Sequence, residues 1–116
     1  EDAGYLIAYA LAEDNLANGL DVVADSVNAI ELTRRAWHEV AERTGARLVD
    51  VELTCSDPAE HRRRVEHRRP EREGQQLPTW DDVIGRTHEP WCRDRLTIDT
   101  ARCAAEEAVD YVESCL

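Results

Sequence analysis

The apolar positions at the start of the chain follow a helical repeat. Spacings of three and four residues between them predict a helix over residues 3–18. Its buried stripe consists of Tyr5, Ala8, Tyr9, Ala12 and Leu16. Gly19 follows, and glycine suits the left-handed conformation that often ends a helix. The apolar run at residues 20–25 then predicts a largely buried strand, and residues 26–28 a loop.

The rest of the chain alternates between helical and extended patterns. Further strands are predicted over residues 47–54 and 96–99, and further helices over residues 30–44, 58–69, 79–84 and 101–114. The segment Ser56-Asp57-Pro58 places a capping residue before a proline, which is typical of a helix start. Residues 71–78 are polar and lack periodicity, so we expect a mobile loop there.

This alternation predicts an α/β fold with a parallel sheet and helical crossovers. The length of 116 residues suits a single domain spanning residues 1–116. Parallel sheets bind ligands at the carboxyl ends of their strands. We therefore expect Asp25, residues 54–56 and residues 99–101 to line one edge of the sheet.

Composition narrows the classes of function. The formal net charge of −11 argues against a nucleic-acid or anionic-membrane binder, since both surfaces would repel the chain. All fourteen basic residues are arginine, so lysine chemistry is excluded, and so is an intact Walker A loop. The four cysteines and the histidines show no zinc-binding spacing, and we expect free thiols, no metal site and a cytoplasmic location.

Asp25 is the first candidate for chemistry, because it ends an apolar run and precedes a small polar loop. A carboxylate there can accept a proton from a substrate hydroxyl, and Asn28 can orient the substrate. Alternatively, Asp25 caps the helix that begins near Ile30, or pairs with an arginine.

Two groups of arginines are candidates for binding phosphate or carboxylate. Arg34 and Arg35 lie one turn into the second helix, although a solvated helix face explains at least one of them equally well. On a continuous helix Arg64 and Arg68 share a face, and two guanidinium groups beside a mobile loop can clamp a polyphosphate. The alternative for this run is a solvated basic face balanced by neighbouring glutamates.

Several segments, read in order, resemble the P-loop small-molecule kinases, in particular the relatives of gluconate kinase, chloramphenicol kinase and zeta toxin. The segments are Leu20 to Asn28, Arg34-Arg35, Val51 to Glu60, Arg64-x-x-x-Arg68, Thr79 to Val83, His88-Glu89-Pro90 and Leu96 to Thr100. The resemblance covers nearly the whole chain. It implies an ATP-dependent kinase with a P-loop NTPase fold, a transferase that uses ATP and Mg²⁺ to phosphorylate a small hydroxyl-bearing substrate.

The same resemblance implies roles for individual residues. Asp25 would contact the phosphate acceptor or act as the base, with Asn28 and either Arg34 or Arg35 on the substrate side. Arg64 and Arg68 would match the lid arginines that close over ATP, in a lid-like segment at about residues 61–79.

The defining element of that family, a Gly-rich loop with Gly-Lys-Ser/Thr, is not in this sequence. The chain therefore resembles the C-terminal part of such a kinase, truncated at its N-terminus, with the first strand and the phosphate loop missing. We expect no ATP or Mg²⁺ on this part alone. In the family the first strand lies between the strands matched by residues 20–25 and 47–54, so we expect either a missing N-terminal portion, or rearrangement or strand exchange in a homodimer, to fill the gap. The alternative function is a non-catalytic α/β interaction or regulatory module.

Overall fold

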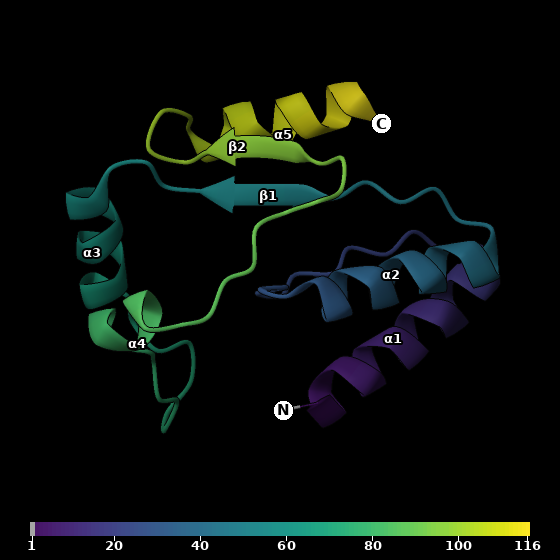
Figure 1. Cartoon of the computed structure of the whole chain (residues 1–116), viewed down its shortest axis with the longest axis horizontal. Helices are drawn as coiled ribbons and strands as arrows, with labels where there is room; N and C mark the ends of the chain where they lie inside the picture. Colours follow the sequence, from purple (N-terminus) through teal and green to yellow (C-terminus); the bar gives the residue numbers. More distant parts are fainter. Residues whose placement is uncertain (1) are drawn as a thin grey trace. The chain divides into compact units, whose positions relative to one another are not determined.

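The computed structural model describes residues 2–116, which belong to two compact units (Figure 1). The first unit runs to Leu48 and includes Thr87–Arg93, and the second comprises Val49–Arg86 and Asp94–Leu116. Each unit has its own secondary structure. A single domain over residues 1–116 stays a prediction.

Two helices form the first unit, α1 at Asp2–Ala17 and α2 at Glu31–Thr44. They pack through a small core of Ala12, Trp37 and Val40, and the edge of the Tyr9 ring meets Trp37 with 4.7 Å between centroids. Gly45 ends α2 in the left-handed conformation, with φ 72°. The sequence predicted both helices, and the structure confirms them.

The predicted strand at residues 20–25 is wrong. These residues are not assigned to any strand, and Leu20 and Val23 expose 56% and 93% of their surface. In the part of the chain that the structure describes, the backbone of residues 21–27 makes no hydrogen bond. A strand needs a neighbour for its ladder, and the described strands both belong to the second unit.

The second unit contains a two-stranded parallel sheet flanked by helices. Strand β1 at Val51–Thr54 pairs with β2 at Leu96–Asp99, so that Val51 faces Leu96 and Thr54 faces Asp99. The chain crosses from β1 to β2 through α3 at Pro58–His67 and α4 at Trp80–Ile84, and α5 at Ala105–Cys115 follows β2. The predicted α/β class is confirmed in this general form.

Local capping explains where α3 and α4 begin. The Asp57 carboxylate accepts from two backbone N–H groups of the first turn of α3, and Pro58 follows it, as the sequence predicts. Thr79 and Asp82 form a reciprocal capping box at α4. Between these helices the edge of the His61 ring meets Trp80, with 5.0 Å between centroids.

Three predicted boundaries in the second unit need correction. Strand β1 contains only the last four residues of the predicted 47–54, because its partner β2 is itself four residues long. Helix α3 ends at His67, before the predicted Pro70. Helix α5 begins at Ala105 instead of residue 101, because Thr100 and Arg102 turn back to bond Thr54 and Asp99.

Candidate functional site

The carboxyl end of the β1–β2 pair gathers polar groups. One oxygen of the Asp99 carboxylate accepts from the backbone N–H groups of Ser56 and Ala101, each at 3.0 Å. The side-chain hydrogen bond from Ser56, followed by the two backbone N–H groups, lowers the pKa of Asp99. The expectation of one sheet edge is confirmed for residues 54–56 and 99–101. It is wrong for Asp25, because residues 20–25 form no strand.

Arg64 is held at this same edge. Its Nη1 donates to the Thr100 hydroxyl at 2.9 Å, and its Nη2 donates to the Thr100 carbonyl at 3.0 Å. Thr100 in turn donates through both N–H and hydroxyl to the Thr54 carbonyl, at 2.7 and 2.8 Å. The Arg64 side chain remains 43% exposed, so a positive charge stands at the carboxyl end of the strands within reach of solvent.

All three arginines of α3 contact glutamates. Arg62 pairs with Glu66, and Arg63 and Arg64 both contact Glu60. The hydrogen bond from Arg63 is the main reason that the pKa of Glu60 falls to about 2. The alternative of a solvated basic face balanced by glutamates is therefore confirmed for Arg62 and Arg63.

Arg68 lies just beyond α3, in extended backbone with ψ 137°, and is exposed. The expectation that Arg64 and Arg68 share a face of one helix is wrong, because the helix ends at His67. The role of Arg68 as a lid arginine stays a prediction.

Arg34 belongs to the interior of the first unit. It is fully buried, and its guanidinium donates to the backbone carbonyls of Asn28, Glu89 and Pro90 at 2.9, 2.9 and 3.2 Å. The group also lies over the Trp91 ring, 4.2 Å from its centroid. Arg35, the next residue of α2, is exposed. Substrate binding stays a prediction for both residues, whereas Arg34 already has a structural role.

The helical repeat carried a signal for the burial of Arg34. Arg34, Trp37 and Ala41 are separated by three and four residues, so they lie on one face of α2, and all three are buried. A charged residue on an apolar face needs several partners, and the carbonyls of the first unit supply them.

Asn28 contacts both Arg34 and α1. Its backbone N–H donates to the Tyr5 hydroxyl at 3.1 Å, and it adopts the uncommon left-handed conformation with φ 47°. The oxygen of its side-chain amide is buried and has no partner within the described residues. Asn28 is therefore a rigid part of the first unit with one acceptor atom still unsatisfied.

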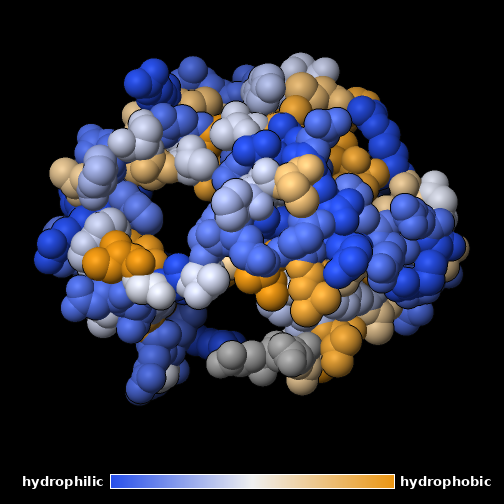
Figure 2. Space-filling view, in the orientation of Figure 1, coloured by the Kyte–Doolittle hydropathy of each residue, from blue (hydrophilic) through white to orange (hydrophobic). Residues whose placement is uncertain are grey.

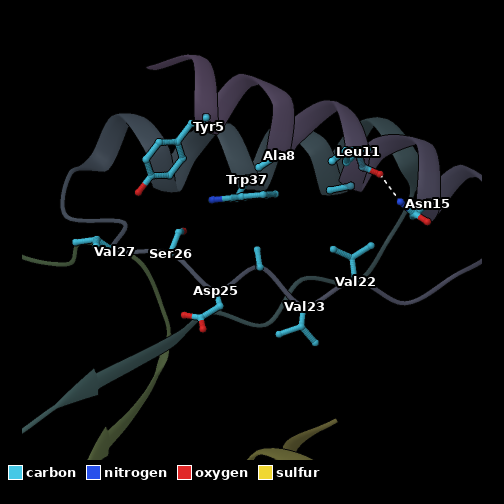
Figure 3. A pocket seen from close by; sticks show the side chains of 13 residues that line it. Tyr5, Ala8, Leu11, Asn15, Val22, Val23, Asp25, Ser26, Val27 and Trp37 are labelled. Atoms are coloured by element: carbon cyan, nitrogen blue, oxygen red, sulfur yellow. Dashed lines mark hydrogen bonds between the residues drawn. The ribbon is translucent and has the colours of Figure 1, made fainter. Parts of the chain in front are cut away.

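Asp25 lies on the wall of a cavity of about 630 Å³ in the first unit (Figure 3). One wall is α1, through Tyr5, Ala8 and Leu11, and the other is the extended segment 22–27. Within the described residues, Asp25 makes no hydrogen bond or ion pair. The N-cap residue of α2 is Ile30, and the Glu89 side chain accepts from the N–H of Glu31 at the start of the helix. The alternatives that Asp25 caps α2 or pairs with an arginine are wrong.

The cavity also contains a polar atom that the sequence did not indicate. Trp37 is only 8% exposed, and its indole Nε1 is buried without a partner among the described residues. Trp37 belongs to the core of the first unit. No periodicity could have revealed the unpaired N–H group, because it depends on how segment 22–27 lies beside α1 and α2.

Apolar side chains reach the surface in both units (Figure 2), among them Leu6, Leu11 and Val23 in the first and Leu53 and Val109 in the second. Among residues 2–116, no group of three or more His, Cys, Asp and Glu side chains could hold a metal ion. A membrane crossing needs a long apolar helix, and none of the helices within these residues meets that requirement.

The chain matches no protein-family model, no curated protein and no solved structure at a significant level.

Proposed function

We propose that the chain is the C-terminal part of an ATP-dependent kinase that phosphorylates a small hydroxyl-bearing substrate. The observation that carries this proposal is the position of Arg64, which is fixed by Thr100 at the carboxyl end of a parallel strand pair. Parallel α/β sheets bind their ligands at that end, and a guanidinium is suited to phosphate oxygens.

The state of residues 20–25 gives a second line of support. This segment is apolar, extended and without backbone partners in the described part of the chain, and Leu53 on β1 is 64% exposed. In the kinases that the chain resembles, a first strand pairs with the strands matched by these segments, and such a strand would supply the backbone hydrogen bonds that residues 20–25 lack. The strand would come from a preceding part of the protein or from a second copy in a strand-exchanged dimer.

We expect the nucleotide to be held mainly by residues outside this chain. It contains no lysine for the β- and γ-phosphates, and residues 2–116 offer no acidic cluster for Mg²⁺. In the complete kinase, ATP with Mg²⁺ would supply the phosphoryl group. The missing strand and Gly-rich loop would hold that nucleotide.

The residues of this chain would then bind the phosphate acceptor and balance the negative charge of the phosphate groups. Asp25 is exposed at the cavity wall and has no partner there, so its carboxylate can accept a proton from a substrate hydroxyl. Arg64 and Arg68 would balance the phosphate charge, and Asn28 with Arg35 would position the acceptor. Arg34 would act indirectly, by holding Asn28 in place.

Phosphoryl transfer by the longer protein tests the proposal. The protein encoded together with the upstream coding sequence is purified and supplied with radiolabelled ATP, Mg²⁺ and a panel of small alcohols. We expect label transfer, a loss of about a hundredfold or more with Asp25→Asn, and little change with Asp21→Asn, whose carboxylate does not line the cavity.

An upstream sequence without Gly-x-x-x-x-Gly-Lys-Ser/Thr, together with no label transfer, would contradict the kinase. That result would favour the alternative of a non-catalytic α/β interaction or regulatory module.

A further inference from the structure

We propose that the cavity between α1 and residues 22–27 binds a small neutral or cationic molecule with an apolar body and a hydrogen-bond acceptor. Nothing in the resemblance to kinases assigns a site between these elements. Three features of the cavity support this proposal: its shape, one unpaired N–H donor and the charge of its walls.

The walls suit an apolar body. Tyr5, Ala8 and Leu11 of α1 face the extended segment across about 630 Å³, and Val22 adds a branched side chain from the other side (Figure 3). Pockets of roughly 300–1,000 Å³ with mainly apolar walls and a few polar groups are typical of small-molecule sites. The cavity has both the size and the lining of such a site.

Trp37 supplies the specific polar contact. Its side chain lines the cavity, the residue is 8% exposed, and Nε1 has no partner among the described residues. Figure 3 shows the nitrogen end of the indole directed toward the end of the cavity where Tyr5 and Ser26 lie. An unpaired buried N–H group is costly, so an acceptor atom on a ligand would be favourable at this point.

Tyr5 can add a second donor at the same end of the cavity. Its hydroxyl oxygen accepts from the Asn28 N–H, which leaves the hydroxyl hydrogen able to donate to a ligand. An oxygen of an alcohol, an ether or an amide between Tyr5 and Trp37 would satisfy both donors.

The charge of the residues that line the cavity determines which class of ligand can bind. Among the described residues that line the cavity, Asp25 is the only charged one, and none is an arginine. A phosphate, a carboxylate or a nucleotide would therefore meet repulsion without compensation, in a chain of formal net charge −11. Neutral molecules and cations avoid this repulsion, and a cation is in addition attracted by the negative charge of Asp25.

The binding site does not depend on the kinase proposal, but the identity of its ligand as the phosphate acceptor does. If the kinase proposal holds, the acceptor is an apolar alcohol or amino alcohol that binds in this cavity. Binding without phosphorylation by the longer protein would retain the site and remove the kinase.

Three probes with the same apolar body separate the possibilities: 2-phenylethanol is neutral, 2-phenylethylamine is cationic and phenylacetate is anionic. Each is titrated into the 116-residue chain while the indole N–H resonances are followed by two-dimensional NMR, with Trp37→Phe identifying the Trp37 signal. We expect the neutral and cationic probes to shift the Trp37 resonance, and phenylacetate to bind at least about tenfold more weakly.

Matched variants connect the binding to the cavity. Ala8→Leu places a larger side chain in the cavity and should weaken binding at least about tenfold, whereas Ala10→Leu, on the exposed side of the same helix, should leave it unchanged. Trp37→Phe keeps an aromatic ring and removes the donor, so 2-phenylethanol should bind about three- to tenfold more weakly, as measured by the remaining amide shifts. Ala24→Leu on the opposite wall serves the same purpose as Ala8→Leu if that variant does not fold.

The proposal is overturned if no probe shifts the Trp37 resonance, or if phenylacetate binds as tightly as 2-phenylethanol. It is also overturned if a folded Ala8→Leu or Ala24→Leu protein binds like the unaltered chain.

Discussion

The guanidinium of Arg34 lies over the indole ring of Trp91, with 4.2 Å between its central carbon and the ring centroid. The same group donates to three backbone carbonyls, from Asn28, Glu89 and Pro90. One buried side chain therefore connects the start of α2 to the distant segment Thr87–Arg93 of the first unit. Glu31 adds to this connection by accepting from Arg93 at 2.7 Å, and this hydrogen bond lowers the pKa of Glu31.

Replacing Arg34 should destabilise the chain strongly. Arg34→Met removes the donors and leaves three backbone carbonyls without these partners, so we expect a loss of about 2–4 kcal/mol in the free energy of unfolding. Urea unfolding followed by tryptophan fluorescence measures it. The neighbouring Arg35→Met is the control, because Arg35 is exposed and should change stability by no more than about 0.5 kcal/mol. Equal losses for the two variants would contradict the role given to Arg34.

The Thr100 hydroxyl should stabilise the carboxyl end of the sheet. It donates to the Thr54 carbonyl at 2.8 Å and accepts from Arg64 at 2.9 Å, so Thr100→Val should cost about 1–2 kcal/mol. Chemical denaturation compares it with Thr97→Val, which is the same substitution at an exposed position of β2. If Thr97→Val costs as much, the hydroxyl of Thr100 contributes nothing specific.

Glu60 should make the chain less stable in acid. Its pKa is about 2 in the folded chain against an ordinary value of 4.5, so on acidification the unfolded state takes up this proton first. The stabilisation from Glu60 is therefore complete above about pH 4.5 and is lost as the pH falls toward 2. Carboxyl NMR titration measures the midpoint directly.

Arginine substitutions check the cause of this shift. Arg63→Gln should raise the pKa of Glu60 toward its ordinary value, because the hydrogen bond from Arg63 is the largest contribution. Arg62→Gln is the matched control, since Arg62 pairs with Glu66. A Glu60 midpoint that moves equally in both variants would show that the net charge of α3, and not the contact with Arg63, sets the value.

Features with local causes were predictable from the sequence. Asp57 before Pro58 and Thr79 before α4 cap their helices through side chains only two or three residues away, and Gly45 ends α2 by its own backbone freedom. The strand Leu96–Asp99 was also predicted with correct bounds.

Features that depend on distant residues were not predictable. Residues 20–25 have the composition of a buried strand, but a strand forms only beside another, and residues 2–48 contain none. For the candidate site, the sequence indicated Asp25 and Arg64 as chemically capable residues, yet it could not show that Thr100 holds Arg64 or that the Trp37 N–H is unpaired. Those two facts arise from packing between segments far apart in the chain.

The most direct test of the kinase proposal is calorimetric titration of ATP with Mg²⁺ into two proteins, the 116-residue chain and the longer protein obtained when the upstream coding sequence is included. The account predicts no measurable binding to the chain, which has no lysine for the phosphates, and micromolar affinity for the longer protein. Micromolar affinity for the chain alone, or none for the longer protein, would contradict it.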